Sequence, residues 1–286
     1  MTPIDMTPIH EELAGRTVMV VGGPSSGKTA RAQELARAMA ERAGPAALVS
    51  ADMGQQALGV PTCMVLSTAG PYDRASAAWF VGDVSPRSNM LPSVVGTEQL
   101  VRRAKAGGAQ TVVIDTTGMI AGQPGLVLKY HKALAAGVDA VVALQRESEL
   151  ELLLGMLGGL CPTVHRLPVP PEAKDRSAEQ RAVYRRERYA EYFREADLVR
   201  VEAGRLLGPD WAPDPIRRQE FPLPGAVVGL LDAEDFCLGI GLVEKLLPGK
   251  LVLFTPWSDA EAVVRMRLGK LRLDRQADYA ETRTLG

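Results

Sequence analysis

The sequence predicts an α/β fold: a parallel sheet with helices on both faces, then an arginine-rich helical segment, then a small C-terminal β domain. The apolar runs that predict the sheet are continuous rather than alternating and are separated by helical stretches, which is typical of strands buried on both faces. A glycine-rich loop joins the first run to its helix. From residue 225 onward the pattern changes to short strands and turns. A length of 286 residues is enough for about two domains.

Local composition predicts each element in turn. The sheet strands are short apolar runs, expected at residues 17–21, 46–50, 77–81, 111–114 and 140–144. Stretches rich in helix formers alternate with these runs, at residues 30–42, 96–105 and 126–136. In the C-terminal part, short apolar runs bounded by turn residues predict strands at residues 227–231, 237–243, 251–255 and 263–273.

Prolines mark the predicted boundaries. Pro168, Pro170 and Pro171 end the sheet region, and a polar, arginine-dense helical segment follows at residues 172–194. Residues 209–224 are proline-rich, as linkers often are. We therefore predict an N-terminal extension at 1–15, an α/β domain at 16–212 that includes the arginine-rich segment at about 172–195, and a C-terminal β domain at 213–286.

Composition excludes several classes of protein. The 33 lysines and arginines nearly equal the 34 aspartates and glutamates, so no basic field covers the whole molecule, as it would in a protein that coats duplex nucleic acid. The three cysteines lack any CxxC spacing, which argues against a disulfide framework or a zinc ribbon. No signal-peptide pattern opens the chain, and its longest apolar stretch is too short to span a bilayer. We expect a cytoplasmic protein without a membrane partner.

The most specific motif is the loop GGPSSGKT at residues 22–29, which fits G-x-x-x-x-G-K-[ST] between a predicted strand and a predicted helix. Its glycines let backbone N–H groups surround a phosphate, and the helix N-terminus adds its dipole. In this motif Lys28 reaches the β and γ phosphates, and Thr29 offers its hydroxyl to Mg²⁺. A P-loop NTPase fold is therefore predicted, with a nucleotide site made of Gly23, Pro24, Ser25, Ser26, Gly27, Lys28, Thr29 and Ala30.

Two carboxylates are predicted at the same edge of the sheet as this loop. Asp52 follows the second predicted strand, and Asp115 directly follows the run at residues 111–114. One carboxylate of such a pair suits holding a hydrated Mg²⁺ or Mn²⁺ ion, and the other suits orienting or deprotonating an acceptor hydroxyl. The pair therefore favours phosphoryl transfer from a bound nucleoside triphosphate.

Several further motifs are shared with one known family. They are DMGQ at 52–55, GVP at 59–61, FVGD at 80–83, SP at 85–86, IDTTGMI at 114–120, VDAVVAL at 138–144, DRSAEQR at 175–181 and YF at 192–193. In these motifs the chain resembles the polynucleotide 5′-hydroxyl kinases, which include the kinase subunit of the pre-mRNA cleavage machinery, the pre-rRNA processing kinases and shorter prokaryotic relatives. The resemblance implies transfer of the γ-phosphate of ATP, or of another nucleoside triphosphate, to the 5′-hydroxyl end of RNA or DNA.

The resemblance also implies roles for individual residues. Asp52 would engage the acceptor hydroxyl and the metal shell, while Arg176 and Arg181, in a mobile lid, would cover the donor phosphates. A guanidinium is suited to this task because it can neutralise phosphoryl charge through two hydrogen bonds. The expected catalytic residues are Lys28, Asp52, Arg176 and Arg181, the substrate-binding residues Gln55, Thr116 and Thr117, and the metal ligands Thr29, Asp52 and Asp115.

Two departures and three alternatives accompany this interpretation. Met119 stands where several family members have a Trp that stacks on the substrate nucleotide. Many eukaryotic members have Asn in place of Asp115, so we rank Asp52 first as the base. The arginine-rich segment also fits an ordinary solvated helix with i,i+4 ion pairs. A regulatory NTPase switch and a small-molecule kinase are the alternative functions. A guanine-specific switch is disfavoured, because residues 144–147 read LQRE and lack an N/T-K-x-D motif.

Overall fold

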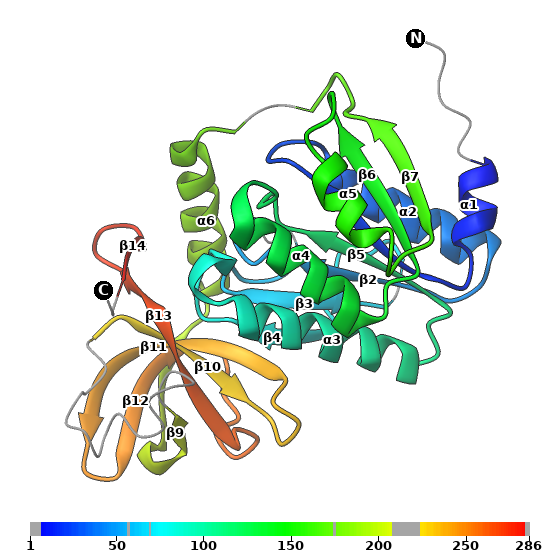
Figure 1. Ribbon diagram of the computed structural model, residues 1–286. Helices are drawn as coiled ribbons and strands as arrows, with labels where there is room; N and C mark the ends of the chain where they lie inside the picture. Colours follow the sequence, from blue (N-terminus) through cyan, green and yellow to red (C-terminus); the bar gives the residue numbers. More distant parts are fainter. Residues whose placement is uncertain (1–6, 56–57, 69, 174–175, 208–223, 284–286) are drawn as a thin grey trace. The chain divides into compact units, whose positions relative to one another are not determined.

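The chain divides into two units by its contacts (Figure 1). The computed structural model describes residues 7–55, 58–68, 70–173, 176–207 and 224–283. The first unit comprises residues 1–59, 64–76 and 86–177, and the second comprises 60–63, 77–85 and 178–286. The predicted linker residues 209–223, and the predicted boundary between 212 and 213, lie outside the described residues.

The first sheet has the strand order β4-β3-β2-β5-β1-β6-β7. Pairing is parallel along the series β2-β5-β1-β6-β7, as predicted, whereas β3 runs antiparallel to β2. The prediction missed two strands of this sheet, β3 and β7, although the five residues of β3 are apolar or small and all buried. The strands are β1 (Thr17–Gly22), β2 (Ala46–Ala51), β3 (Cys63–Ser67), β4 (Ala77–Phe80), β5 (Thr111–Thr116), β6 (Ala140–Gln145) and β7 (Thr163–Pro168).

Helices cover both faces of this sheet, which confirms the predicted α/β fold. On one face, Leu13 of α1 and Leu35 of α2 join a core cluster with Val20 of β1 and Val113 of β5. On the other face α3 packs against α4. The helices of the first unit are α1 (Thr7–Leu13), α2 (Lys28–Arg42), α3 (Met90–Ala106), α4 (Gly122–Ala136) and α5 (Glu151–Leu157), with a short 3₁₀ turn η1 at Pro86–Ser88.

A second sheet, in the order β14-β13-β10-β11-β12-β8, confirms the predicted C-terminal β domain, and β9 pairs with β13 beside it. The strands β8, β9 and β14 were not predicted, because they are short or carry charged residues at alternate positions. The strands are β8 (Asp197–Glu202), β9 (Leu206–Leu207), β10 (Ala226–Leu231), β11 (Cys237–Leu247), β12 (Lys250–Thr255), β13 (Arg265–Asp274) and β14 (Ala280–Arg283), and a 3₁₀ turn η2 occupies Ala203–Arg205.

Helix α6 (Ala178–Tyr192) packs within the second unit, against this sheet. Tyr189 is fully buried, and Phe193 stacks on the rings of Phe254 and Tyr279, with centroids 5.8 and 5.7 Å away. The Tyr192 hydroxyl accepts a hydrogen bond from the backbone N–H of Ile240 at 2.8 Å. One face of a helix that is mostly polar in sequence is therefore fixed to the β domain by aromatic residues.

No helix in the described part of the chain combines the length and the apolar composition that crossing a membrane requires.

Candidate active site

The P-loop follows β1 and leads into α2, as the motif predicts. Ser25 and Gly27 have φ values of 54° and 79°, so the loop turns through the left-handed region twice. A Cβ atom on Gly22 would lie 2.4 Å from Ser26 Oγ and 2.8 Å from the Leu144 carbonyl oxygen, so the loop can close over β6 only with glycine there. A loop that turns in this way before a helix N-terminus is the kind of backbone that can surround a phosphate.

Lys28 lies inside this cradle. Its Nζ donates hydrogen bonds to the Gly23 carbonyl oxygen at 2.6 Å and to Ser26 Oγ at 3.4 Å, and the side chain is buried. Burial lowers the pKa of Lys28 below its ordinary value, while the Asp115 and Asp52 carboxylates act to raise it. An anionic phosphate at this position would offset the cost of burying the ammonium group.

Asp115 lies at the end of β5, beside the P-loop, because β5 pairs with β1 in register Asp115 to Val20. Thr29 Oγ1 donates to Asp115 Oδ2 at 2.7 Å. The other carboxylate oxygen, Oδ1, is buried and has no hydrogen-bond partner among the described residues. Burial raises the pKa of Asp115 to about 6; the Thr29 hydrogen bond opposes this rise and the Asp52 carboxylate adds to it.

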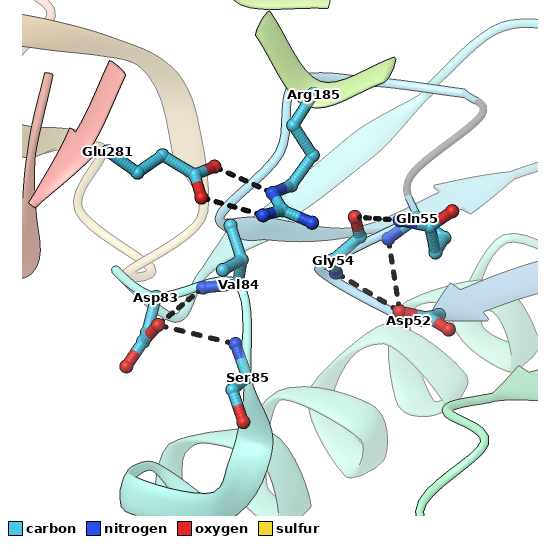
Figure 2. A network of polar contacts seen from close by, with 8 residues as sticks. All are labelled: Asp52, Gly54, Gln55, Asp83, Val84, Ser85, Arg185 and Glu281. Atoms are coloured by element: carbon cyan, nitrogen blue, oxygen red, sulfur yellow. Dashed lines mark hydrogen bonds and ion pairs between the residues drawn. The ribbon is translucent and has the colours of Figure 1, made fainter. Parts of the chain in front are cut away.

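Asp52 leaves the end of β2 and is held by its own loop (Figure 2). Its Oδ1 accepts the backbone N–H groups of Gly54 and Gln55, both at 3.1 Å. No bond within the described residues occupies Oδ2, and the side chain is partly exposed. The Gln55 side chain turns back and donates to the Gly54 carbonyl oxygen at 2.8 Å, which stiffens the same loop.

The two predicted threonines have different surroundings. Thr116 is fully buried, and its hydroxyl donates to the Val20 carbonyl oxygen at 2.8 Å, so it is used within the sheet. Thr117 is at the edge of the buried region, next to Gly118. A Cβ atom on Gly118 would lie 2.8 Å from both Cα and N of Pro24. The turn after β5 therefore lies against the P-loop backbone.

The predicted lid spans both units. Residues 170–173 lie over the P-loop, since a Cβ atom on Gly27 would come within 3.6 Å of Pro170 and 3.9 Å of Ala173. The backbone N–H of Arg176 donates to Ser25 Oγ at 3.3 Å. Arg181 belongs to α6 in the second unit, and Lys174 and Asp175 lie outside the described residues.

Sequence reasoning missed two lysines of this region, Lys129 and Lys132, which are both fully buried on α4. Lys129 Nζ donates to the Thr117 carbonyl oxygen at 2.6 Å and to Thr117 Oγ1 at 3.3 Å. Lys132 Nζ lies 3.9 Å from Met64 Sδ. Burial lowers the pKa of Lys132 to about 8, against the opposing Asp52 and Asp115 carboxylates. The only signal in the sequence was a pair of lysines three residues apart within an otherwise apolar helix.

The second unit contains two further polar anchors, also shown in Figure 2. Arg185 of α6 and Glu281 of β14 form a paired salt bridge with N···O distances of 2.6 and 2.7 Å. Asp83 is fully buried; its Oδ1 accepts the backbone N–H groups of Val84 and Ser85 at 2.7 and 3.3 Å. The Arg185–Glu281 pair joins α6 to β14, whereas the Asp83 bonds fix a local turn, and both are structural tasks.

The donor set around the P-loop is suited to a hard cation. Among the described residues no group of three or more histidine, cysteine or acidic side chains is placed to hold a metal ion by itself. The predicted set instead combines one hydroxyl, Thr29, with two carboxylates, Asp52 and Asp115. A protein site for Mg²⁺ typically supplies one or two carboxylates and leaves the other positions to water and substrate phosphates, so this set fits.

Comparison with known proteins gives consistent relatives. A model of the family described as mRNA cleavage and polyadenylation factor CLP1 P-loop matches residues 22–195. A polyribonucleotide 5′-hydroxyl-kinase of Pyrococcus horikoshii is 26% identical over 314 residues, covering 90% of this chain and 86% of that protein. A protein of Pyrococcus furiosus with the same description is 28% identical, covering 90% and 87%. A solved structure of the wild-type Clp1p–Pcf11p complex is similar in fold, with a TM-score of 0.72 over 93% of this chain and 78% of that one, at 15% identity.

Proposed function

The chain belongs to the mRNA cleavage and polyadenylation factor CLP1 P-loop family, and on that premise we propose that it is a polynucleotide 5′-hydroxyl kinase. It transfers the γ-phosphoryl group of ATP, or of another nucleoside triphosphate, to the 5′-hydroxyl end of RNA or DNA. Relatives described as polyribonucleotide 5′-hydroxyl-kinases, aligned over 90% of the chain, support this activity. The observation that carries it is the P-loop geometry, in which Lys28 Nζ lies 2.6 Å from the Gly23 carbonyl oxygen and Thr29 Oγ1 lies 2.7 Å from Asp115 Oδ2.

The donor is bound by the P-loop. Backbone N–H groups of residues 23–30 surround the phosphates, and Lys28 contacts the β and γ phosphates through its ammonium group. Arg176 and Arg181 neutralise the charge that develops on the transferred group and on the leaving oxygen. The hydrogen bond from the Arg176 backbone to Ser25 supports this role for Arg176.

The acceptor is oriented by Asp52. The oxygen of the 5′-hydroxyl forms a bond to the γ-phosphorus while the bond from that phosphorus to the β,γ-bridging oxygen breaks. The hydroxyl proton passes to Asp52. Because Gly54 and Gln55 hold only Oδ1 of this carboxylate, Oδ2 is available to accept that proton. Gln55 and Thr117 are the substrate contacts we retain from the sequence, whereas the hydroxyl of Thr116 is already used by Val20.

Thr29, Asp115 and Asp52 would hold Mg²⁺ or Mn²⁺. Thr29 donates its proton to Asp115, so the lone pairs of its oxygen remain available to a cation. Asp115 Oδ1, which has no hydrogen-bond partner among the described residues, would be a second ligand. A magnesium ion bound there would neutralise charge on the phosphate oxygens. We place the enzyme in the cytoplasm, with a nucleoside triphosphate and a nucleic-acid end as its binding partners.

The test is label transfer from γ-labelled ATP to two oligonucleotides that differ only in having a 5′-hydroxyl or a 5′-phosphate. We expect label on the 5′-hydroxyl oligonucleotide alone. The Asp52→Asn variant keeps an oxygen to accept the loop N–H groups, so it should fold while its turnover falls by about a hundredfold or more. Label on neither oligonucleotide would refute the proposed activity, and near-native turnover by Asp52→Asn would refute the role of Asp52.

A further inference from the structure

Two buried lysines on α4 lie next to the proposed site without an ion-pair partner. Lys129 and Lys132 are both 0% exposed, and neither forms a salt bridge with any described residue. Removing an ammonium group from water without a counter-ion is costly, and an apolar side chain would fill the same space without that cost. Burial holds the pKa of Lys129 well below its ordinary value, and Lys132 and Lys28 lower it further. The burial of each lysine therefore needs an explanation.

Their contacts differ. Lys129 donates to both the carbonyl oxygen and the hydroxyl oxygen of Thr117, whereas the one polar contact of Lys132 within the described part of the chain is the thioether of Met64. Lys129 therefore fixes the turn that follows β5, and Lys132 does not touch it. The same turn lies against Pro24 of the P-loop through Gly118.

The polarity of the bond between Lys129 and Thr117 decides what the threonine can do. Lys129 Nζ is the donor in both contacts with Thr117, so Thr117 Oγ1 accepts. Thr117 donates no hydrogen bond to any described residue, so its hydroxyl proton remains available. Lys129 thus orients this hydroxyl as a donor, and its natural acceptor is an anionic oxygen.

The register of the sheet bears on which anion would accept a hydrogen bond from Thr117. Thr116 of β5 pairs with Ala51 of β2, so Thr117 and Asp52 leave the sheet at the same level on neighbouring strands. Asp52 is the residue that orients the acceptor hydroxyl. β5 also pairs with β1, Asp115 with Val20, so Thr117 leaves the sheet between Asp52 and the P-loop. The P-loop already supplies Lys28 and backbone N–H groups to the donor phosphates, so a phosphate of the acceptor is the anion left for Thr117.

We infer that Lys129 is a positioning residue: it orients the Thr117 hydroxyl to donate to a phosphate oxygen of the polynucleotide, next to the 5′-hydroxyl that is phosphorylated. This inference rests on the proposed kinase activity, and it assigns to a buried lysine the task of presenting the substrate contact. The same contact would favour acceptors with an internucleotide phosphate over a free nucleoside.

The test compares Lys129→Met with Lys132→Met, a matched control that makes the same change at an equally buried site on the same helix. Two 5′-hydroxyl oligonucleotides are used, one natural and one with a neutral methylphosphonate between its first two nucleotides. With the natural substrate, kcat/KM of Lys129→Met should fall by about tenfold to a hundredfold. With the methylphosphonate substrate, kcat/KM of Lys129→Met should equal that of the wild type. For Lys132→Met, kcat/KM should equal that of the wild type with both oligonucleotides.

Three results would overturn the inference. An equal proportional loss on both oligonucleotides would make Lys129 a purely structural residue. A loss of ATP affinity with no loss of discrimination between the oligonucleotides would assign Thr117 to the donor. An unchanged Lys129→Met enzyme would remove the residue from the reaction altogether.

Additional arms separate this inference from the kinase activity itself. If the wild type labels neither oligonucleotide, the kinase proposal fails. Fluorescence anisotropy then still tests the inference, because it measures whether Lys129→Met loses the preference for binding the natural oligonucleotide over the methylphosphonate one. If Lys129→Met does not fold, Thr117→Val carries the same comparison, because it removes the hydroxyl that Lys129 orients. Thr117→Val should reproduce the Lys129→Met pattern, and combining the two changes should add little further loss.

Discussion

The contact between Gly118 and the P-loop gives the sharpest quantitative prediction. In Gly118→Ala the new Cβ would lie 2.8 Å from Cα and N of Pro24 and 3.2 Å from the carbonyl carbon of Gly23. Ordinary carbon contacts are about 3.5–4.0 Å, so one of the two backbone segments must move by several tenths of an ångström. No flexible side chain is available to absorb the strain, because every atom approached belongs to the backbone.

The expected cost follows from that geometry. Overpacking of this kind typically costs about 1–3 kcal/mol, and here the strain falls on the loop that binds the donor phosphates. We therefore expect Gly118→Ala to lower the free energy of unfolding by about that amount and to weaken ATP binding by about tenfold. Urea unfolding measures the first quantity and isothermal titration calorimetry measures the second.

Gly155 supplies the matched control. It lies within α5, and a Cβ atom there would meet nothing within 4 Å. Gly155→Ala should leave ATP affinity unchanged and raise the free energy of unfolding by about 0.5–1 kcal/mol, because alanine is the better helix former. If Gly118→Ala bound ATP like the wild type and unfolded at the same urea concentration, the turn would not press on the P-loop and the reasoning would be wrong.

Three further predictions concern charge. Folding lowers the pKa of Lys132 from 10.5 to about 8, so the wild-type protein becomes more stable as pH rises from 8 toward 10.5. The free energy of unfolding of Lys132→Met should therefore exceed that of the wild type by up to about 3 kcal/mol at pH 7 and by less at pH 9.5. Urea unfolding at the two pH values measures the difference. Glu281→Gln breaks a partly buried salt bridge to Arg185 and should lower the free energy of unfolding by about 1–3 kcal/mol. Glu202→Gln breaks an exposed ion pair with Lys250 and should lower it by under about 1 kcal/mol. Equal melting temperatures for the two variants would contradict this difference. Arg176→Lys should reduce kcat by about tenfold while ATP affinity changes less, and an unchanged kcat would return that residue to the solvated surface.

The nucleotide-binding part of the fold was predictable because its signals are local. A continuous apolar run, a glycine motif and a helix follow one another within β1, the P-loop and α2, and each has its own pattern. The direction of β3 was not predictable in this way. A short apolar run indicates a strand but does not say whether its neighbour runs parallel or antiparallel, and β3 in fact runs antiparallel to β2.

The remaining differences depend on contacts between residues far apart in the chain. Along α6 the alternating charges predict local ion pairs, and Arg188 does pair with Glu191 three residues on, but Arg185 pairs with Glu281, 96 residues away. Lysine side chains are seldom fully buried unless they are paired, so the sequence did not predict that Lys129 is buried or that it contacts Thr117. The candidate site could therefore be named from motifs, while the residues that support it could be found only from the structure.

The γ-phosphoryl group held by the P-loop should pass to a polynucleotide end rather than to water. The most direct measurement is the partition of γ-label between the oligonucleotide 5′ end and free inorganic phosphate in one reaction mixture. We predict that most of the label reaches the 5′ end and that Lys28→Ala abolishes both products. Release of free phosphate by the wild type, with no label on the 5′ end at any oligonucleotide concentration, would contradict the claim and favour a regulatory NTPase.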